Sequence, residues 1–197
     1  MDNKYEPILQ KIRELFNNPD GFIPLHAPYF GGNEKKYVLE TIDSTFVSSV
    51  GPFVTKFEEM MRDITGAGYA IATMNGTTAL HLSLLVAGVK HGDAVITQPL
   101  TFAATANAIA HSGAVPIFVD VDRDTMGLSP DALQNWLKEN TVVKDGQCYV
   151  RSTNQRIAAC VPMHTFGFTL RIKEVMEICN RNHIPVVEDA AESLGSY

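Results

Sequence analysis

Residues 94–120 read AVITQPLTFAATANAIAHSGAVPIFVD, and this stretch decides the fold class. It begins with one short apolar run, Ala94–Thr97, and ends with a second, Val115–Asp120. Between them, Thr101–Ser112 is rich in alanine and carries apolar side chains at helical spacing. A strand, a helix and a strand in this order predict a right-handed βαβ unit on a parallel sheet.

The same alternation continues on both sides of this stretch. Further strands are predicted at Tyr69–Thr73, Arg156–Val161 and Pro185–Asp189, and further helices at Thr77–Ala87, Pro130–Leu137 and Leu170–Arg181. Ser129 is the expected N-cap of the helix that Pro130 begins, and Thr101 that of the helix in the central stretch. The polar segment Gln147–Arg156 is expected to be a long loop. The pattern therefore predicts an α/β fold with a mostly parallel sheet.

The N-terminal part of the chain carries three helical patterns. The first ends near residues 17–21, the second follows Asn33 as a possible N-cap, and the third follows Gly51 and Pro52. We expect residues 1–22 to form a helical arm and residues 23–197 to belong to one larger domain.

Composition excludes several classes of function. The net charge of −6 disfavours binding to a nucleic-acid backbone. No apolar run approaches the ~20 residues of a membrane span, and the polar start is unlike a signal peptide. Cys148, Cys160 and Cys179 lack the spacing of a zinc site or a disulfide framework, and the histidines are scattered. We therefore expect a cytoplasmic protein without a metal site, a nucleic-acid partner or a membrane partner.

Ligands of parallel α/β sheets bind beyond the carboxyl ends of the strands, and chemically useful residues follow several of these strands. Gly76 and Thr77 open a helix, where backbone N–H groups attract a phosphate, although Asn-Gly-Thr is also an ordinary capping turn. Phe102 is expected in the first turn of the next helix, where it either stacks on a flat ligand or packs in the core. His164 either lines the cleft or binds only neighbouring backbone.

Asp189 ends the last predicted strand, and Glu192 follows on the same side. A carboxylate there is costly to bury unless it faces a cation. The protonated ring nitrogen of pyridoxal 5′-phosphate (PLP) is such a cation, and PLP enzymes pair it with a carboxylate. A phosphate cradle, an aromatic ring and an acid at three strand ends together favour a PLP site.

Four segments resemble the DegT/DnrJ/EryC1/StrS family of PLP-dependent aminotransferases, which act on nucleotide-linked keto-sugars. They are residues 75–82 (NGTTALHL), 101–109 (TFAATANAI), 119–122 (VDVD) and 187–196 (VEDAAESLGS). The resemblance implies the three-layer, aspartate aminotransferase-like (type I) fold, with helices on both faces of the sheet. Residues 23–197 would be the N-terminal part of the PLP-binding large domain, and the rest of that domain and the small domain would be absent.

The resemblance also implies roles for single residues. Gly76 and Thr77 would hold the PLP phosphate, Phe102 would stack on the ring, and Glu192 would lie near its 3-oxygen. Asp189 would be the catalytic partner of the ring nitrogen. Asn75 departs from the serine that is commoner in the family at its position. The partners implied are a nucleotide-sugar, an amino-acid donor and, in the complete protein, a second copy in a homodimer.

Residues 44–54, 121–130 and 163–167 are most similar to a subgroup of this family, the 4-aminotransferases of legionaminic-acid-type sugar synthesis. That likeness implies a UDP-linked 4-keto-6-deoxy-N-acetylhexosamine as substrate and glutamate as donor, in surface polysaccharide or nonulosonic acid synthesis.

The family's Schiff-base lysine lies past the Glu-Asp-Ala-Ala motif, and none of the nine lysines here matches its position. We therefore expect a chain cut short at Tyr197 and inactive alone. Two alternatives stay open: a keto-sugar dehydratase of the same family, with histidine in place of that lysine, and a non-catalytic binding remnant.

Overall fold

A computed structural model describes residues 4–24 and 27–196; Tyr197, on which the expectation about the chain's end rests, lies outside the described residues. The described chain divides into two compact units, Met1–Phe57 and Glu58–Tyr197. Helices α1 (Glu6–Leu15) and α2 (Glu34–Asp43) belong to the first unit, and α3 (Pro52–Thr65) crosses the division. Asn33 precedes α2 as predicted, but its side chain makes no capping hydrogen bond. The described part of the predicted arm, residues 4–22, lies within the first unit, and its role as an arm stays a prediction.

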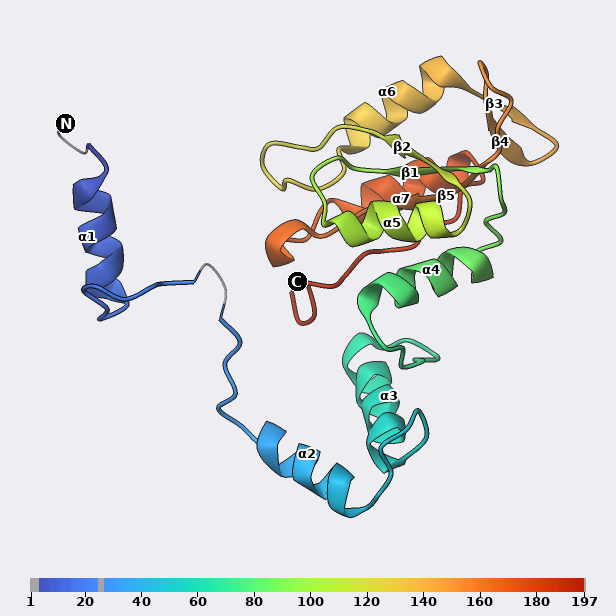
Figure 1. Cartoon of the computed structure of the whole chain (residues 1–197). Helices are drawn as coiled ribbons and strands as arrows, with labels where there is room; N and C mark the ends of the chain where they lie inside the picture. The colour runs from blue at the N-terminus through green and yellow to red at the C-terminus, as the bar shows by residue number, and fades with distance from the viewer. Residues whose placement is uncertain (1–3, 25–26, 197) are drawn as a thin grey trace. The chain divides into compact units, whose positions relative to one another are not determined.

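A parallel sheet of three strands organises the second unit, and this confirms the predicted fold class (Figure 1). The strands are β1 (Ala94–Thr97), β2 (Val115–Phe118) and β5 (Ile157–Val161), in the order β2–β1–β5. Ala94 pairs with Val115 on one side of β1, and Thr97 pairs with Val161 on the other. The helices α4 (Gly76–Val86), α5 (Ala103–His111), α6 (Pro130–Asn140) and α7 (Ile172–Arg181) surround it.

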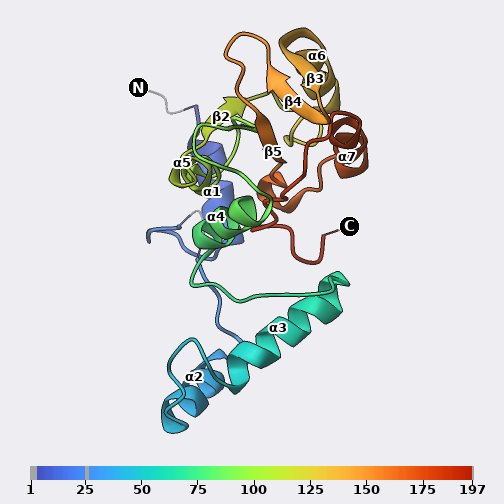
Figure 2. The same ribbon diagram turned by 90° about the vertical axis from the view of Figure 1, so that its right-hand side faces the viewer.

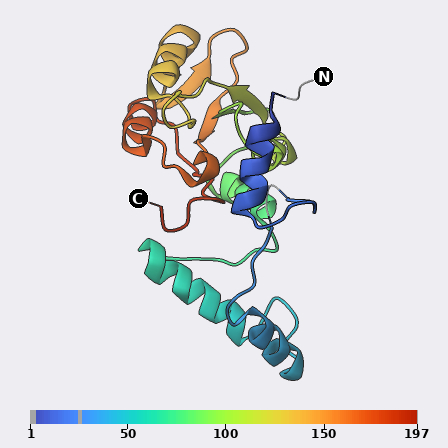
Figure 3. The same ribbon diagram turned by 90° about the vertical axis from the view of Figure 1, so that its left-hand side faces the viewer.

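The two faces of the sheet bury two separate cores. Ala94 and Ile96 of β1 pack with α6 and α7, through side chains such as Leu133 and Val175. Val95, on the opposite face, packs with α4 and α5. Figure 3 shows the same division, with the yellow and orange helices on one side of the strands and the green helices on the other. Because every residue of β1 is buried, this strand lies at the centre of the fold.

The predicted strand Tyr69–Thr73 is wrong. In the described residues this segment pairs with no strand, and its Tyr69 and Ile71 side chains are 91% and 81% exposed. Its apolar composition fits a strand, but a strand also needs a neighbour for its N–H and C=O groups. In the described residues the N–H group of Ala72 instead donates to the side chain of Glu58, at 2.8 Å.

The predicted strand Pro185–Asp189 is only partly formed. This segment runs parallel to the end of β5 through two isolated bridges, Cys160 with Val186 and Met163 with Asp189. The ladder is interrupted because Pro162 and Pro185 both lack an N–H group. The bridges still fix where Asp189 lies, since its N–H donates to the carbonyl of Pro162 at 2.9 Å.

The predicted loop Gln147–Arg156 is also wrong, because its first residues belong to an antiparallel hairpin (Figure 2). Strand β3 (Thr141–Lys144) pairs with β4 (Gln147–Val150) around the turn Asp145-Gly146. Both turn residues have positive φ, 50° and 72°, as a two-residue hairpin turn requires. An Asp-Gly pair between β-branched residues is a recognised hairpin signal, so the sequence did contain this element.

The three cysteines are buried and free. Cys148 of β4, Cys160 of β5 and Cys179 of α7 all belong to the core below α6 and α7. A hydrogen bond with Cys179, together with burial, raises the pKa of the Cys160 thiol well above 9.0. Burial also raises the pKa of Cys148, against a hydrogen bond from Thr141 that lowers it. The folded chain therefore keeps these thiols protonated at a pH where the unfolded chain loses the protons.

This difference predicts a loss of stability at alkaline pH. Below about pH 9 this contribution is constant, and above it the Cys160 thiol lowers the free energy of unfolding by up to about 1.4 kcal/mol per pH unit. Replacing Cys160 by alanine should remove the contribution of this thiol to the fall of the free energy of unfolding with pH. Urea unfolding of the wild type and of Cys160→Ala at several pH values from 8 to 10.5 measures the difference. Parallel pH profiles would contradict this prediction.

None of the helices in the described ranges combines the length and the apolar character that crossing a membrane demands. Within the same ranges, no group of three or more His, Cys, Asp or Glu side chains is arranged to hold a metal ion.

Candidate active site

A cleft of about 390 Å³ lies beyond the carboxyl ends of the strands in the second unit. All five residues predicted from the sequence as site residues line it. The complete lining is Asn75, Gly76, Thr77, Leu80, Phe102, Ala104, Met163, Asp189, Ala191 and Glu192. The chain thus brings together residues that are more than a hundred positions apart.

The N-terminus of α4 forms one wall of the cleft. The Asn75 side chain caps the helix by accepting a hydrogen bond from the N–H of Thr78, at 2.9 Å. The N–H groups of Gly76 and Thr77 lie in the first turn, where a helix has no carbonyl of its own to offer them. A Cβ atom added at Gly76 would meet no atom within 4 Å. This end of α4 therefore has backbone donors and open space in front of them, which suits an anion.

Phe102 forms another part of the wall and is 71% exposed. It is the N-cap residue of α5, so the predictions of Thr101 as the N-cap and of Phe102 in the first turn are both wrong. The Thr101 hydroxyl does not cap the helix. It lies 2.6 Å from the Thr105 hydroxyl and 3.0 Å from the sulfur of Met163. An exposed aromatic ring on the edge of a cleft is available for stacking on a planar ligand.

Asp189 is the acid of the cleft and is only 4% exposed. Its Oδ2 accepts a hydrogen bond of 2.6 Å from the Thr105 hydroxyl. Its Oδ1 accepts a longer one, of 3.4 Å, from the N–H of Ala191. A buried carboxylate is stable only when it is hydrogen-bonded or paired with a cation. Sequence reasoning did not find Thr105, which lies in the first turn of α5, four residues after Thr101.

Glu192 is exposed at the mouth of the cleft. Its Oε2 accepts a hydrogen bond of 2.8 Å from the N–H of Phe166. Phe166 and Gly167 both have positive φ, and a Cβ on Gly167 would lie 2.8 Å from the Glu192 carbonyl oxygen. The loop after β5 therefore needs glycine at position 167 to come this close to Glu192.

His164 does not line the cleft. Its Nε2 is 3.0 Å from Glu188, and its Nδ1 accepts a hydrogen bond from the N–H of Leu170. Since Nδ1 accepts, the neutral ring carries its proton on Nε2 and donates it to the glutamate. Of the two interpretations left open for His164, the one in which it lines the cleft is wrong, and the one in which it binds only neighbouring backbone is right in part, because its ring binds the backbone of Leu170 but also the side chain of Glu188.

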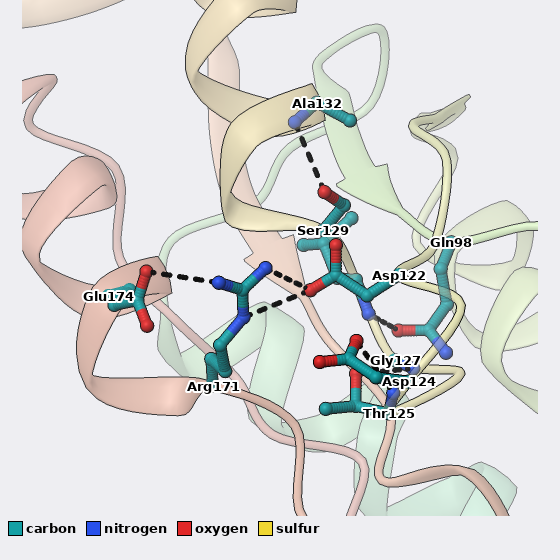
Figure 4. Close-up of polar contacts among 10 residues, drawn as sticks. Gln98, Asp122, Asp124, Thr125, Gly127, Ser129, Ala132, Arg171 and Glu174 are labelled. Atoms are coloured by element: carbon teal, nitrogen blue, oxygen red, sulfur yellow. Dashed lines mark hydrogen bonds and ion pairs between the residues drawn. The ribbon is translucent and has the colours of Figure 1, made fainter.

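Gln98 is a fully buried residue that sequence reasoning missed. Its Oε1 accepts hydrogen bonds from the N–H groups of Leu128 and Met163. Figure 4 shows the Gln98 amide beside the loop that carries Asp122, Asp124 and Gly127. Its Nε2 lies 2.9 Å from the carbonyl oxygen of Leu100, 3.0 Å from the hydroxyl of Thr165 and 3.4 Å from the carbonyl oxygen of Met126. This one amide joins the loops that follow β1, β2 and β5. The signal in the sequence is a polar amide directly after a short strand that is buried throughout.

Arg171 holds the loop after β2 from the other side (Figure 4). Its guanidinium donates to Asp122 through Nε and Nη2, and Glu174 lies 3.6 Å away. The hydrogen bond to Asp122 is the main cause that raises the pKa of Arg171 above its usual value. Ser129 caps α6 as predicted, accepting from the N–H of Ala132. The loop is thereby fixed at both its ends.

Comparison with known proteins places these features in a family. The model of the DegT/DnrJ/EryC1/StrS aminotransferase family matches residues 28–197. A GDP-perosamine synthase of Caulobacter vibrioides is 38% identical over 174 residues, which cover 88% of this chain and 43% of that protein. The putative pyridoxal phosphate-dependent aminotransferase EpsN of Bacillus subtilis is 36% identical, with coverages of 88% and 42%.

Solved structures of related proteins have a similar fold. An aminotransferase from Psychrobacter cryohalolentis has a TM-score of 0.73 and 27% identity, over 89% of this chain and 40% of that one. A 3-amino-5-hydroxybenzoic acid synthase has a TM-score of 0.72 and 28% identity, over 88% and 41%. The chain spans 40–44% of the length of the curated relatives it matches.

Proposed function

The chain belongs to the DegT/DnrJ/EryC1/StrS aminotransferase family, and on this basis we propose that the full-length protein transfers an amino group to a nucleotide-linked 4-keto-6-deoxy sugar. Its cofactor would be PLP, which aminotransferases of this family bind. The observation that carries the proposal is the buried Asp189 carboxylate in a cleft that also contains Phe102 and the N-terminus of α4.

The residues of the cleft fit this cofactor. The first-turn N–H groups of Gly76 and Thr77 and the Thr77 hydroxyl would bind the phosphate, in the open space before Gly76. Phe102 would stack on the ring. Asp189 would hold a proton on the ring nitrogen, which in turn would supply the cation that a buried carboxylate needs. Glu192 would lie beside the 3-oxygen, its own Oε2 held by the N–H of Phe166.

PLP, when bound, supplies an electron sink for the bond changes next to the transferred nitrogen. Transamination also needs a base that moves a proton, and in this family it is the lysine described above. None of the cleft residues in the described part of the chain is a lysine. The proposal therefore concerns the full-length protein, of which this chain would supply the cofactor cradle.

Two observations support a nucleotide-linked sugar as the substrate, but they favour different nucleotides. Two of the relatives named GDP-perosamine synthase, 38% and 36% identical, favour a GDP-linked sugar. The resemblance of residues 44–54, 121–130 and 163–167 to legionaminic-acid-type 4-aminotransferases favours a UDP-linked N-acetylhexosamine. We propose a 4-keto-6-deoxy sugar in both cases, with glutamate as the amino donor.

One assay tests the reaction and the nucleotide together. The purified full-length protein, with PLP and glutamate, is expected to aminate one of the GDP-linked and UDP-linked 4-keto-6-deoxy sugars. We expect kcat/KM for the preferred nucleotide to exceed that for the other by about 10-fold or more. Mass spectrometry of the sugar and release of 2-oxoglutarate measure the reaction. Loss of a hydroxyl group without gain of nitrogen would instead identify a dehydratase, and no turnover of either sugar would contradict the proposal.

A further inference from the structure

We propose that Thr105, with Thr101 behind it, is a positioning residue for the carboxylate of Asp189. In this arrangement Thr105 holds Oδ2, so that Oδ1 stays directed at the ring nitrogen of the cofactor. The inference rests on the proposed function, because it concerns how Asp189 meets that nitrogen.

Three side chains form a continuous hydrogen-bonded row. The Thr101 and Thr105 hydroxyls are 2.6 Å apart, and the Thr105 hydroxyl is 2.6 Å from Oδ2 of Asp189. Thr105 is fully buried and Asp189 nearly so. Thr105 lies in the first turn of α5 and Thr101 just before that helix, whereas Asp189 comes from the segment beside β5. The row therefore joins two elements that meet only in the folded chain.

The direction of the protons in this row follows from the chemistry of its members. An ionised carboxylate only accepts, and each threonine has one hydroxyl proton. Thr105 must therefore donate to Asp189, and its oxygen accepts the single hydroxyl proton of Thr101. In this arrangement the sulfur of Met163, 3.0 Å from the Thr101 hydroxyl, is a contact that receives no proton. Hydrogen bonds that point the same way polarise and strengthen one another.

The two carboxylate oxygens of Asp189 thus differ in their hydrogen bonds. Oδ2 is held by a short hydrogen bond, and Oδ1 receives the 3.4 Å contact from the N–H of Ala191. A donor that is strong and close to one oxygen fixes the rotamer of the whole carboxyl group. Oδ1 keeps the lone pairs with which an N–H cation can form a charge-assisted hydrogen bond.

A second buried threonine provides the matched control. Thr97 of β1 is also fully buried, and its hydroxyl donates to the carbonyl of Val161 at 2.8 Å. Thr97 is not among the residues that line the cleft. Replacing Thr97 by valine therefore removes a buried hydroxyl and a hydrogen bond without touching Asp189.

The experiment compares Thr105→Val, Thr105→Ser and Thr97→Val in the full-length protein. The probe is pyridoxamine 5′-phosphate, which binds without a bond to lysine. We expect Thr105→Val to raise the Kd of the probe by about 10-fold to 100-fold. This factor corresponds to the free energy of one hydrogen bond to a charged group. Thr105→Ser should stay within about 3-fold of the wild type, since it keeps the donor. Thr97→Val should bind normally, although it unfolds at a lower temperature.

The 15N chemical shift of ring-labelled probe gives a second readout that a structural defect would not move. We expect a protonated ring nitrogen in the wild type, Thr105→Ser and Thr97→Val, and a shift towards the neutral form in Thr105→Val. Unchanged binding in Thr105→Val, or equal losses in Thr105→Val and Thr97→Val, would overturn the role of Thr105 and leave the proposed function intact. A wild type that does not bind the probe would overturn both.

Discussion

Asp189→Asn is expected to lower the rate of amination by the full-length protein about 1,000-fold, the largest effect of any single substitution in the cleft. Asparagine has nearly the same shape and can still accept from Thr105, but it cannot pair with a cation. A buried cation that loses its counterion costs about 3–5 kcal/mol. The ring nitrogen would then lose its proton, and with it most of the cofactor's capacity to accept electrons.

The measurement is kcat for sugar amination under saturating PLP, with thermal unfolding as the check on folding. Asp120→Asn is the matched control, because Asp120 follows β2 at the same edge of the sheet, is exposed and does not line the cleft. The control is expected to retain its rate, and both variants should unfold within a few degrees of the wild type. A rate for Asp189→Asn within about 10-fold of the wild type would refute the pairing of Asp189 with the ring nitrogen.

Gln98→Ala is expected to lower the free energy of unfolding by about 4 kcal/mol. Without the amide, the buried N–H groups of Leu128 and Met163 lose their acceptor. Each buried group left unpaired costs about 1–3 kcal/mol, and the vacated volume adds the cost of a cavity. Because the same amide joins three loops at the cleft, cofactor affinity should fall as well.

Urea unfolding of Gln98→Ala beside Gln134→Ala measures this effect. Gln134 lies on the exposed face of α6, where its side chain is 3.4 Å from Arg181. Replacing Gln134 by alanine removes the same atoms as replacing Gln98. We expect it to change the free energy of unfolding by less than about 0.5 kcal/mol. Similar losses in the two variants would mean that the buried amide contributes no more than an exposed one.

Most of the βαβ core could be predicted from the sequence because the spacing of its apolar residues is clear. In residues 94–120, apolar strands and an alanine-rich helix follow one another without interruption, and the structure has β1, α5 and β2 there. Buried parallel strands are apolar throughout, so local composition and final position agree. The rule that ligands bind beyond the carboxyl ends of such strands then brought Phe102 and Asp189 to one edge, where the cleft lies. Gly76 also lines the cleft, although the strand predicted before it is not formed.

The errors have two physical causes. Tyr69–Thr73 has the composition of a strand, but whether a strand forms depends on a partner that local sequence does not contain. Gln147–Val150 looks polar and irregular, yet the turn Asp145-Gly146 fixes a hairpin through the positive φ of its two residues. In the first case the tertiary context was missing, and in the second the turn chemistry was overlooked.

The residues that support the site could not be found from spacing alone. Thr105 and Gln98 look like ordinary polar residues next to buried elements. Their importance lies in contacts across 84 positions, to Asp189, and across 65 positions, to Met163. Such pairings follow only from the way the strands are ordered, with β5 beside β1.

The amide of Gln98 has a consequence for how this protein could diversify. Since the loops after β1, β2 and β5 share one hydrogen-bonding centre, they are not independent modules. A chimera that takes only one of these loops from a relative would have to keep the same backbone donors and acceptors around Gln98, whatever side chains it brought. Changes in the ligand that the cleft accepts should therefore come more readily from side chains at the cleft rim than from exchange of whole loops.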